Sequence, residues 1–200
     1  MQTDEYRTVA AEATGIYKEK GSRFLAFAYN VETADEAKAL LREKQKEYHD
    51  ARHHCYAWRL GGGEGETKVG DDGEPSGTAG RPILGQIQSA GLTNIVVIVV
   101  RYFGGIKLGT GGLIVAYKEA TADALASAQI ETRTFNARLR VSFPYLAMNG
   151  VMKALKDSSA KVLSQDFDTD CAMELSVRLG ERESLTSKLL DVDGVKVEES

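Results

Sequence analysis

An unbroken hydrophobic run at residues 95–100 consists only of isoleucine and valine. A strand with one face in water would alternate polar and apolar residues, so this run predicts a strand buried on both faces. Arg101-Tyr102-Phe103 follows it, then a glycine-rich loop, then a helical pattern that begins near Gly111. Glycines let a backbone approach another group closely, and the first N–H groups of a helix attract anions. We therefore expect functional residues around this loop.

Shorter patterns upstream predict a hairpin, a helix and a strand. Residues 6–31 contain β-type segments, and 18–22 (Lys-Glu-Lys-Gly-Ser) have the composition of a hairpin turn. Thr33 and Glu36 form a capping box, in which each side chain bonds the backbone of the other, and helical spacing continues to about His49. A strand over 52–60 would place alternate side chains on opposite faces. One face then carries His53, Cys55, Ala57 and Arg59, and the other carries His54, Tyr56, Trp58 and Leu60.

Residues 61–80 show no periodic pattern, and we interpret them as one long loop. Structureless segments of this length inside a compact domain are usually functional or mobile. Pro82 suits the first turn of a short helix that ends near Ser89. Beyond the glycine-rich loop, small and apolar residues at helical spacing predict a long helix that packs closely on a sheet: Leu113, Ala116, Tyr117, Ala120, Ala124 and Ala128.

The pattern changes near residues 131–135, so we expect two domains, 1–132 and 133–200. In the second, residues 137–143 alternate as a half-exposed strand, and one helical stripe follows at 148–155. Further strands are expected around Val162 and over 171–179, then a helix at 185–192 and a last strand at 195–197. This βαββαβ order is the ferredoxin-like plan, an antiparallel sheet with helices on one side. The fold class is α+β.

Composition and charge narrow the function classes. The net charge is −4, so any nucleic-acid surface must be a local patch on an acidic body. Two cysteines are too few for a disulfide framework. The chain does not open with a signal-peptide pattern, and its apolar runs fall far short of the roughly 20 residues of a membrane span. We expect a cytoplasmic protein without membrane contact.

The glycine-rich loop fits neither of two phosphate-binding motifs. Thr110 stands where the Walker motif needs lysine, and the dinucleotide fingerprint fails at Ile114. A generic anion nest remains, with exposed backbone and two polar side chains at Gly104, Gly105, Lys107, Gly109, Thr110 and Gly111. A tight turn that allows close packing of helix and strand explains the same glycines, so both interpretations stay open.

The three histidines, His49, His53 and His54, lie close to Cys55. Zinc needs about four converging ligands, and a strand sends His53 and His54 to opposite faces, so we expect no metal there. A cysteine in mid-strand among apolar residues is expected in the core rather than as a nucleophile. We expect no cofactor.

Acidic, basic and aromatic residues flank these motifs. Asp71, Asp72 and Glu74 could bind a divalent cation, although a solvated acidic loop is the simpler interpretation. A basic cleft for RNA phosphates or an acidic protein would form if five cations converge: Arg52, Arg59, Arg81, Arg101 and Lys107. Solvated or ion-paired arginines are the alternative. Stacking on bases could come from Tyr56, Trp58, Tyr102 and Phe103.

Three motifs in this order closely resemble the IMPACT family, in particular its bacterial, YigZ-like branch. They are residues 50–58 (Asp-Ala-Arg-His-His-Cys-Tyr-Ala-Trp), residues 71–82 (Asp-Asp-Gly-Glu-Pro-Ser-Gly-Thr-Ala-Gly-Arg-Pro) and residues 99–113, which contain Arg-Tyr-Phe-Gly-Gly-Ile-Lys-Leu-Gly-Thr-Gly-Gly. The resemblance implies a first domain similar to ribosomal protein S5 domain 2 and a second similar to domain V of elongation factor G. Eukaryotic members are translational regulators that bind the activator of an eIF2α kinase.

The resemblance therefore implies a translation-associated protein that binds RNA, the ribosome or a translation-linked protein. It supplies no catalytic residue. An enzyme that binds a nucleotide or a phosphorylated small molecule is the alternative, since some small-molecule kinases share the first-domain fold and carry a nucleotide loop. The expected binding surface consists of Arg52, His53, His54, Asp71, Asp72, Glu74, Arg81, Arg101, Tyr102, Gly104, Gly105, Lys107, Gly109, Thr110 and Gly111.

Overall fold

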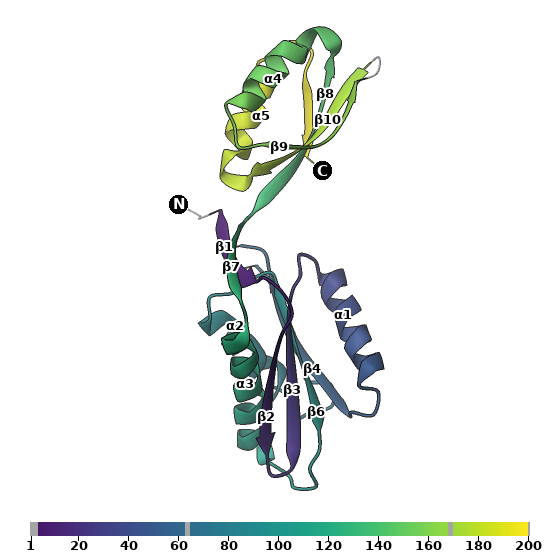
Figure 1. Cartoon of the computed structure of the whole chain (residues 1–200), viewed down its shortest axis with the longest axis vertical. Helices are drawn as coiled ribbons and strands as arrows, with labels where there is room; N and C mark the ends of the chain where they lie inside the picture. Colours follow the sequence, from purple (N-terminus) through teal and green to yellow (C-terminus); the bar gives the residue numbers. More distant parts are fainter. Residues whose placement is uncertain (1–3, 63–64, 168–169, 200) are drawn as a thin grey trace. The chain divides into compact units, whose positions relative to one another are not determined.

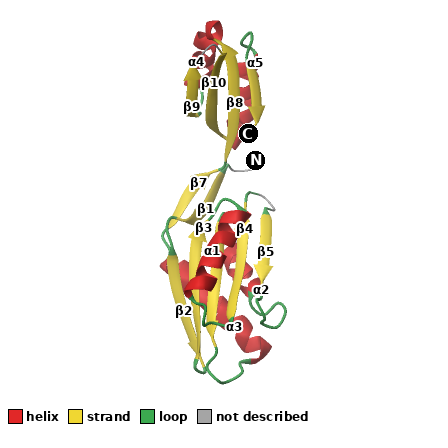
Figure 2. Ribbon diagram, turned by 90° about the vertical axis from the view of Figure 1, so that its right-hand side faces the viewer, coloured by secondary structure: helices red, strands yellow, loops and turns green. Residues whose placement is uncertain are grey.

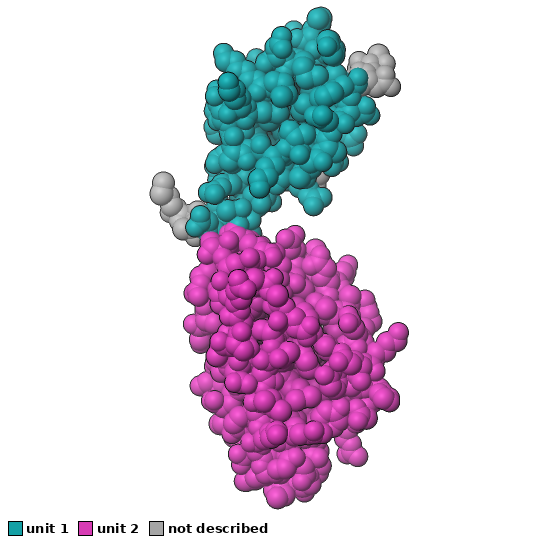
Figure 3. All heavy atoms as spheres, in the orientation of Figure 1, with its two compact units in different colours: residues 1–5, 134–200 teal, residues 6–133 magenta. Residues whose placement is uncertain are grey.

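The computed structural model describes residues 4–62, 65–167 and 170–199, which divide into two compact units (Figure 3). We call residues 6–133 the first unit; they are unit 2, in magenta, in the key of Figure 3. Asp4 and Glu5 group with the second unit, which begins again at Thr134. The sequence placed these N-terminal residues in the first domain, but Asp4 is bonded elsewhere. Its carbonyl accepts from Phe135 N–H at 2.7 Å, and its carboxylate accepts from Gly180 N–H at 2.9 Å.

The first unit contains one five-stranded sheet, in the order β2-β3-β6-β4-β5, with every neighbouring pair antiparallel. A separate two-stranded sheet pairs β1 with β7. Helix α1 covers one face of the large sheet, and α2 and α3 cover the other (Figures 1 and 2). The elements in chain order are β1 Glu5–Val9, β2 Ala13–Glu19, β3 Ser22–Asn30, α1 Ala34–Glu47, β4 His53–Leu60, β5 Glu66–Gly70, α2 Gly80–Ser89, β6 Ile95–Tyr102, α3 Gly109–Ser127 and β7 Ile130–Thr134.

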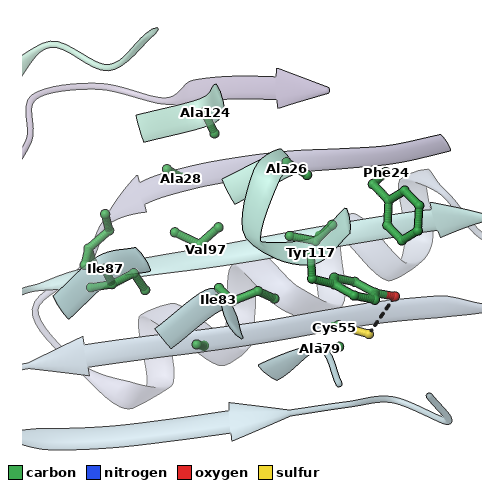
Figure 4. Packing of buried hydrophobic residues seen from close by; sticks show 14 of the residues in the cluster. Phe24, Ala26, Ala28, Cys55, Ala79, Ile83, Ile87, Val97, Tyr117 and Ala124 are labelled. Carbon is green, nitrogen blue, oxygen red and sulfur yellow. Dashed lines mark hydrogen bonds between the residues drawn. The ribbon is translucent and has the colours of Figure 1, made fainter. Parts of the chain in front are cut away.

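Strand β6 lies at the centre of the sheet, and residues 95–100 are fully buried. Ile95, Val97 and Val99 pack into the cluster beneath α2 and α3, and Figure 4 shows Val97 there. Val96 and Ile98 point the other way and join the smaller cluster beneath α1. The prediction of a strand buried on both faces is confirmed.

The hairpin and the first helix are also confirmed, with one difference. Lys20 and Gly21 both have positive φ (46° and 79°), as a two-residue hairpin turn requires. Thr33 caps α1 by accepting from Glu36 N–H at 3.2 Å. The Glu36 carboxylate accepts from Glu32 N–H at 2.7 Å, so it bonds one residue before the expected partner. Only half of the predicted capping box forms.

The expected loop over 61–80 was wrong in part, because residues 66–70 form β5 at the edge of the sheet. This strand pairs only with β4, and its residues stay exposed or half-buried. Of its residues only Val69 packs against the core cluster, so the strand has no hydrophobic alternation and was not visible in the sequence. The helix that contains Pro82 in its first turn is present as α2.

The second unit has the predicted βαββαβ order, with the antiparallel sheet order β11-β8-β10-β9. Its elements are β8 Asn136–Pro144, α4 Met148–Lys156, β9 Lys161–Phe167, β10 Asp170–Arg178, α5 Arg182–Leu190 and β11 Lys196–Glu199. Alternate residues of β8 and β10 pack against the helices and form the core, among them Leu139, Val141, Phe143, Met173, Leu175 and Val177. The α+β fold class is therefore confirmed, whereas likeness to particular domains of S5 and elongation factor G stays a prediction. Among the described helices, none combines the length and apolar character needed to cross a membrane.

Candidate functional site

Three of the predicted motifs meet at one end of the large sheet. His53, the first residue of β4, lies opposite Arg101 near the end of β6. The hairpin turn at Lys20-Gly21 lies beside the glycine-rich loop, because Gly104 N–H donates to Ser22 Oγ at 3.1 Å. We call this region the loop end; it comprises residues 20–23, 50–54, 71–81 and 101–112.

A buried polar cluster lies inside the loop end, around the carboxylate of Glu74. Arg101 donates to Glu74 Oε1 at 2.6 Å, and the Tyr117 hydroxyl donates to the same oxygen at 2.7 Å. The Cys55 thiol in turn donates to the Tyr117 hydroxyl at 3.2 Å, as the dashed line in Figure 4 shows. Each of these bonds joins groups far apart in the sequence, so the cluster ties residues 71–80 to β4, β6 and α3.

The cluster corrects two expectations about the motif residues. Glu74 and Arg101 were assigned to an exposed binding surface, yet they are only 8% and 5% exposed. A buried charge without a partner is costly, so each of these two side chains turns inward to meet the other. The solvated acidic loop was therefore wrong for Glu74, and Arg101 is not free to contact a phosphate.

Asp71 holds the loop in place through its side chain. Its carboxylate accepts from the backbone N–H groups of Gly77, Ala79 and Gly80 at 2.8, 3.1 and 2.8 Å. Burial alone would raise the pKa of Asp71, but these three donors and nearby Arg81 outweigh burial and lower the pKa. The Asp71 side chain therefore replaces the missing side-chain cap at the start of α2.

Replacing Asp71 with asparagine should cost the first unit about 1–2 kcal/mol, because an amide oxygen is a weaker acceptor for three N–H groups. Amide hydrogen exchange at Gly77, Ala79 and Gly80 should speed up in the variant. Since the folded pKa is lowered, the native aspartate stabilises above the ordinary pKa, and this stabilisation is lost as the pH falls through the lowered value. The free energy of unfolding of the wild type and the variant is measured at neutral and at strongly acidic pH. If the difference between them were the same at both pH values, the Asp71 carboxylate would not stabilise the loop.

The two histidines at the start of β4 bond to backbone carbonyls. His53 Nδ1 lies 2.8 Å from Asp72 O, and His54 Nε2 lies 3.0 Å from Tyr48 O. A carbonyl can only accept, so these ring nitrogens carry the protons. Asp72 accepts from His54 N–H at 2.7 Å through its carboxylate. Across the described residues, no group of three His, Cys, Asp or Glu side chains is placed to hold a metal ion.

Cys55 is fully buried in the core, as the sequence predicted. Burial raises the pKa of its thiol, whose single proton has two acceptors within reach, the Tyr117 hydroxyl and Asp71 O at 3.0 Å. A buried thiol with a raised pKa is a poor nucleophile. These properties favour a structural role for Cys55.

The predicted basic cleft forms only in part. Arg52, Arg81 and Lys107 are exposed at the loop end, whereas Arg101 is buried. Arg59 lies at the other end of β4, where it donates to Leu92 O at 3.3 Å. The five cations therefore do not all converge, because the length of β4 separates Arg52 from Arg59.

The aromatic residues separate in the same way. Tyr56 and Trp58 stack on each other, with ring centroids 5.3 Å apart, in the cluster beneath α1. Tyr102 donates to Asp50 at 2.7 Å, and this bond, with partial burial, raises the pKa of Tyr102 to about 12. Arg23 lies 5.0 Å above the Tyr102 ring. Of the four aromatics, Phe103 is the one that the structure leaves half exposed, at 50%.

The glycines of the loop divide between the two interpretations. A Cβ on Gly104 would overlap the backbone of Gly21, so Gly104 serves close packing. A Cβ on Gly105, Gly109 or Gly111 would meet nothing within 4 Å, so there the backbone is open. Helix α3 starts at Gly109 without a side-chain cap. Thr110 is exposed beside it.

Sequence reasoning missed two features of this region. Tyr117 was assigned only to the packing stripe of α3, although it is the one large polar side chain among the alanines of that stripe. Lys20 was assigned only to a turn. Its place beside the glycine-rich loop depends on the pairing of β3 with β6, which no local pattern reveals.

This chain is similar to known proteins in both sequence and structure. A model of the Impact N-terminal domain matches residues 20–125, more than half of the chain. IMPACT family member YigZ of Escherichia coli (strain K12) is 33% identical over 184 residues, which cover 91% of this chain and 90% of that protein. Protein IMPACT homolog of Saccharomyces cerevisiae (strain ATCC 204508 / S288c) is 33% identical over 96 residues, 46% of this chain and 36% of that protein. A crystal structure titled as that of a hypothetical protein has a TM-score of 0.75 at 30% identity and covers 98% of this chain, as well as 97% of its own. The chain belongs to the IMPACT family.

Proposed function

We propose that this protein acts in translation by binding RNA, on or near the ribosome, through the loop end of its first unit. Family membership supports the link to translation, since the IMPACT resemblance implied it. The observation that carries the proposal is the exposed loop after β6. Phe103 and Ile106 are 50% and 55% exposed there, and Lys107 is exposed beside them.

The charges around this loop support RNA as the partner. Lys18, Lys20 and Arg23 are exposed on the adjoining hairpin, and Arg52 and Arg81 are exposed on the neighbouring segments. Phosphate contacts of this kind give most of the affinity for RNA and make it depend on salt. On a chain with a net charge of −4, a local cluster of cations also orients an approaching polyanion.

The test is co-sedimentation with ribosomes and binding to ribosomal RNA over a range of salt concentrations. Lys20→Glu and Lys107→Glu should each weaken binding by roughly tenfold at low salt, because each substitution removes a phosphate contact and adds repulsion. Lys38→Glu is the matched control. It makes the same charge change on α1, where Lys38 pairs with Asp35 at 3.1 Å, and should leave binding unchanged.

Equal binding by all three variants would overturn the proposal. Association that survives nuclease treatment and high salt would identify a protein partner instead. A nucleotide that competes with RNA for the wild-type protein would favour the enzyme alternative at the same loop. Salt-sensitive binding, nuclease-resistant association and nucleotide competition therefore distinguish RNA, a protein and a nucleotide as the partner.

A further inference from the structure

The side chain of Phe103 is half exposed and lies against the Arg101 side chain. The Arg101 guanidinium lies 5.7 Å from the centre of its ring, so one region of the ring is covered while half of the side chain faces solvent. On the next residue, Gly104 N–H donates to Ser22 Oγ and fixes the backbone. A half-exposed aromatic ring with a guanidinium beside it is suited to stacking.

The buried cluster provides the support beneath this ring. Arg101 is held by its ion pair with Glu74 at 2.6 Å and packs over the Phe24 ring at 5.3 Å. Tyr117 holds Glu74 from the side of α3. Since the groups below Phe103 are already ordered, little conformational freedom is lost when a ligand stacks on the ring.

We propose that Phe103 stacks on an unpaired RNA base, while Lys20 and Lys107 contact the flanking phosphates. Lys107 lies four residues after Phe103 in the same loop. Lys20 belongs to the turn whose Gly21 packs against Gly104. This inference rests on the proposed function and specifies the class of RNA that the loop end recognises.

Whether a base is paired determines whether it can stack on Phe103. In an A-form duplex each base is stacked on its neighbours, and proteins contact such duplexes mainly through the backbone and the shallow minor groove. A base in a loop, a bulge or a single strand can turn out and stack on an aromatic ring. The exposed part of the Phe103 ring therefore favours unpaired RNA over a duplex of the same sequence.

The experiment measures affinity and base stacking with the full-length protein. A short single-stranded RNA with one 2-aminopurine, and the same strand in a duplex, are titrated with the wild type and with Phe103→Ala. Wild-type protein should bind the single strand more tightly and change its 2-aminopurine fluorescence. Phe103→Ala should bind the single strand about 5- to 150-fold more weakly and lose the fluorescence change.

Three further variants test whether the effect belongs to the Phe103 ring itself. Tyr145→Ala removes an aromatic side chain that is 68% exposed in the second unit, and it should change neither readout. Phe103→Trp keeps a stacking ring and should restore both. Lys107→Ala should keep the fluorescence change, while the salt slope should fall by about 0.7 for each phosphate that the side chain neutralises in the wild type.

The outcomes separate this inference from the proposed function. If Lys20→Glu and Lys107→Glu weaken RNA binding while Phe103→Ala keeps full affinity and the fluorescence change, the stacking inference is wrong and the proposed function stands. Equal affinity of the wild type for the single strand and the duplex also overturns the inference. If neither the lysines nor Phe103 affect RNA binding, both are wrong.

Discussion

Replacing Arg101 with methionine should destabilise the first unit by about 3–5 kcal/mol, because it leaves the Glu74 carboxylate buried without its counter-ion. The side chains of both residues are nearly inaccessible, at 6% and 3% exposure, so water cannot replace the missing partner. The Tyr117 hydroxyl would still donate to the carboxylate, and His53 Nε2 lies 4.0 Å from the same oxygen. This effect is several times larger than that of an exposed ion pair, which contributes at most about 1 kcal/mol.

The measurement uses the single tryptophan of the chain. Trp58 is 3% exposed in the first unit, so its fluorescence during denaturation follows the unfolding of that unit rather than of the second. Lys38→Met is the matched control, since it breaks an exposed pair on α1 with side chains that are 51% and 91% exposed. A loss in the Arg101 variant no larger than in this control would contradict a buried ion pair.

A double variant separates the value of the pair from the cost of breaking it. Arg101→Met combined with Glu74→Leu removes both charges, so it should be more stable than Arg101→Met alone. Within the described residues, Arg101 Nε is itself buried without a hydrogen-bond partner, so the native pair already carries a desolvation cost that the double variant avoids. Additive losses from the two single changes would show that the groups do not interact.

Helices and strands whose hydrophobic residues recur at regular spacing could be predicted from the sequence. Residues 95–100 predicted their own burial, and alternation along β4 predicted which side chains of residues 53–60 share a face. In the second unit, alternating strands and one-sided helical stripes were enough to give the βαββαβ order. The spacing of hydrophobic residues shows which face of a helix or strand is buried, even when the element that packs on it is not known.

The candidate site could be located from the sequence but not oriented. The motifs at 50–58, 71–82 and 99–113 were assigned to one region, and residues 53, 74 and 101 do come together there. Their sequence could not show that Glu74 and Arg101 face inward, because a charged residue is expected at the surface until its partner is known. Arg101 lies in β6 and Glu74 lies in the loop between β5 and α2, and such long-range pairing leaves no local period. Strand β5 was missed for a related reason, since an edge strand with one partly buried apolar residue shows no alternation.

Replacing Gly15 with alanine should destabilise the first unit by about 3 kcal/mol, at the upper end of the usual cost of overpacking. A Cβ at Gly15 would overlap the backbone nitrogen of Ala124 and lie 2.8 Å from Ala120 O. These atoms belong to the backbone of α3, so no side chain can rotate away and the helix itself must move off β2. That movement would strain the bond from Ile16 N–H to the Asp123 carboxylate, at 2.8 Å, which covers the edge strand.

Gly85→Ala is the matched control for this change. Gly85 lies inside α2, and a Cβ there would meet nothing within 4 Å. Alanine is favoured over glycine in a helix interior by about 1 kcal/mol, so the control should stabilise the same unit that Gly15→Ala destabilises. The free energy of unfolding, followed by Trp58 fluorescence, should fall in Gly15→Ala and rise in Gly85→Ala. That difference would show that the close approach of α3 to β2, rather than the loss of a glycine, determines the effect. If Gly15→Ala also raises the free energy of unfolding, then α3 can move off the sheet at little cost, and its alanine stripe does not require a glycine opposite.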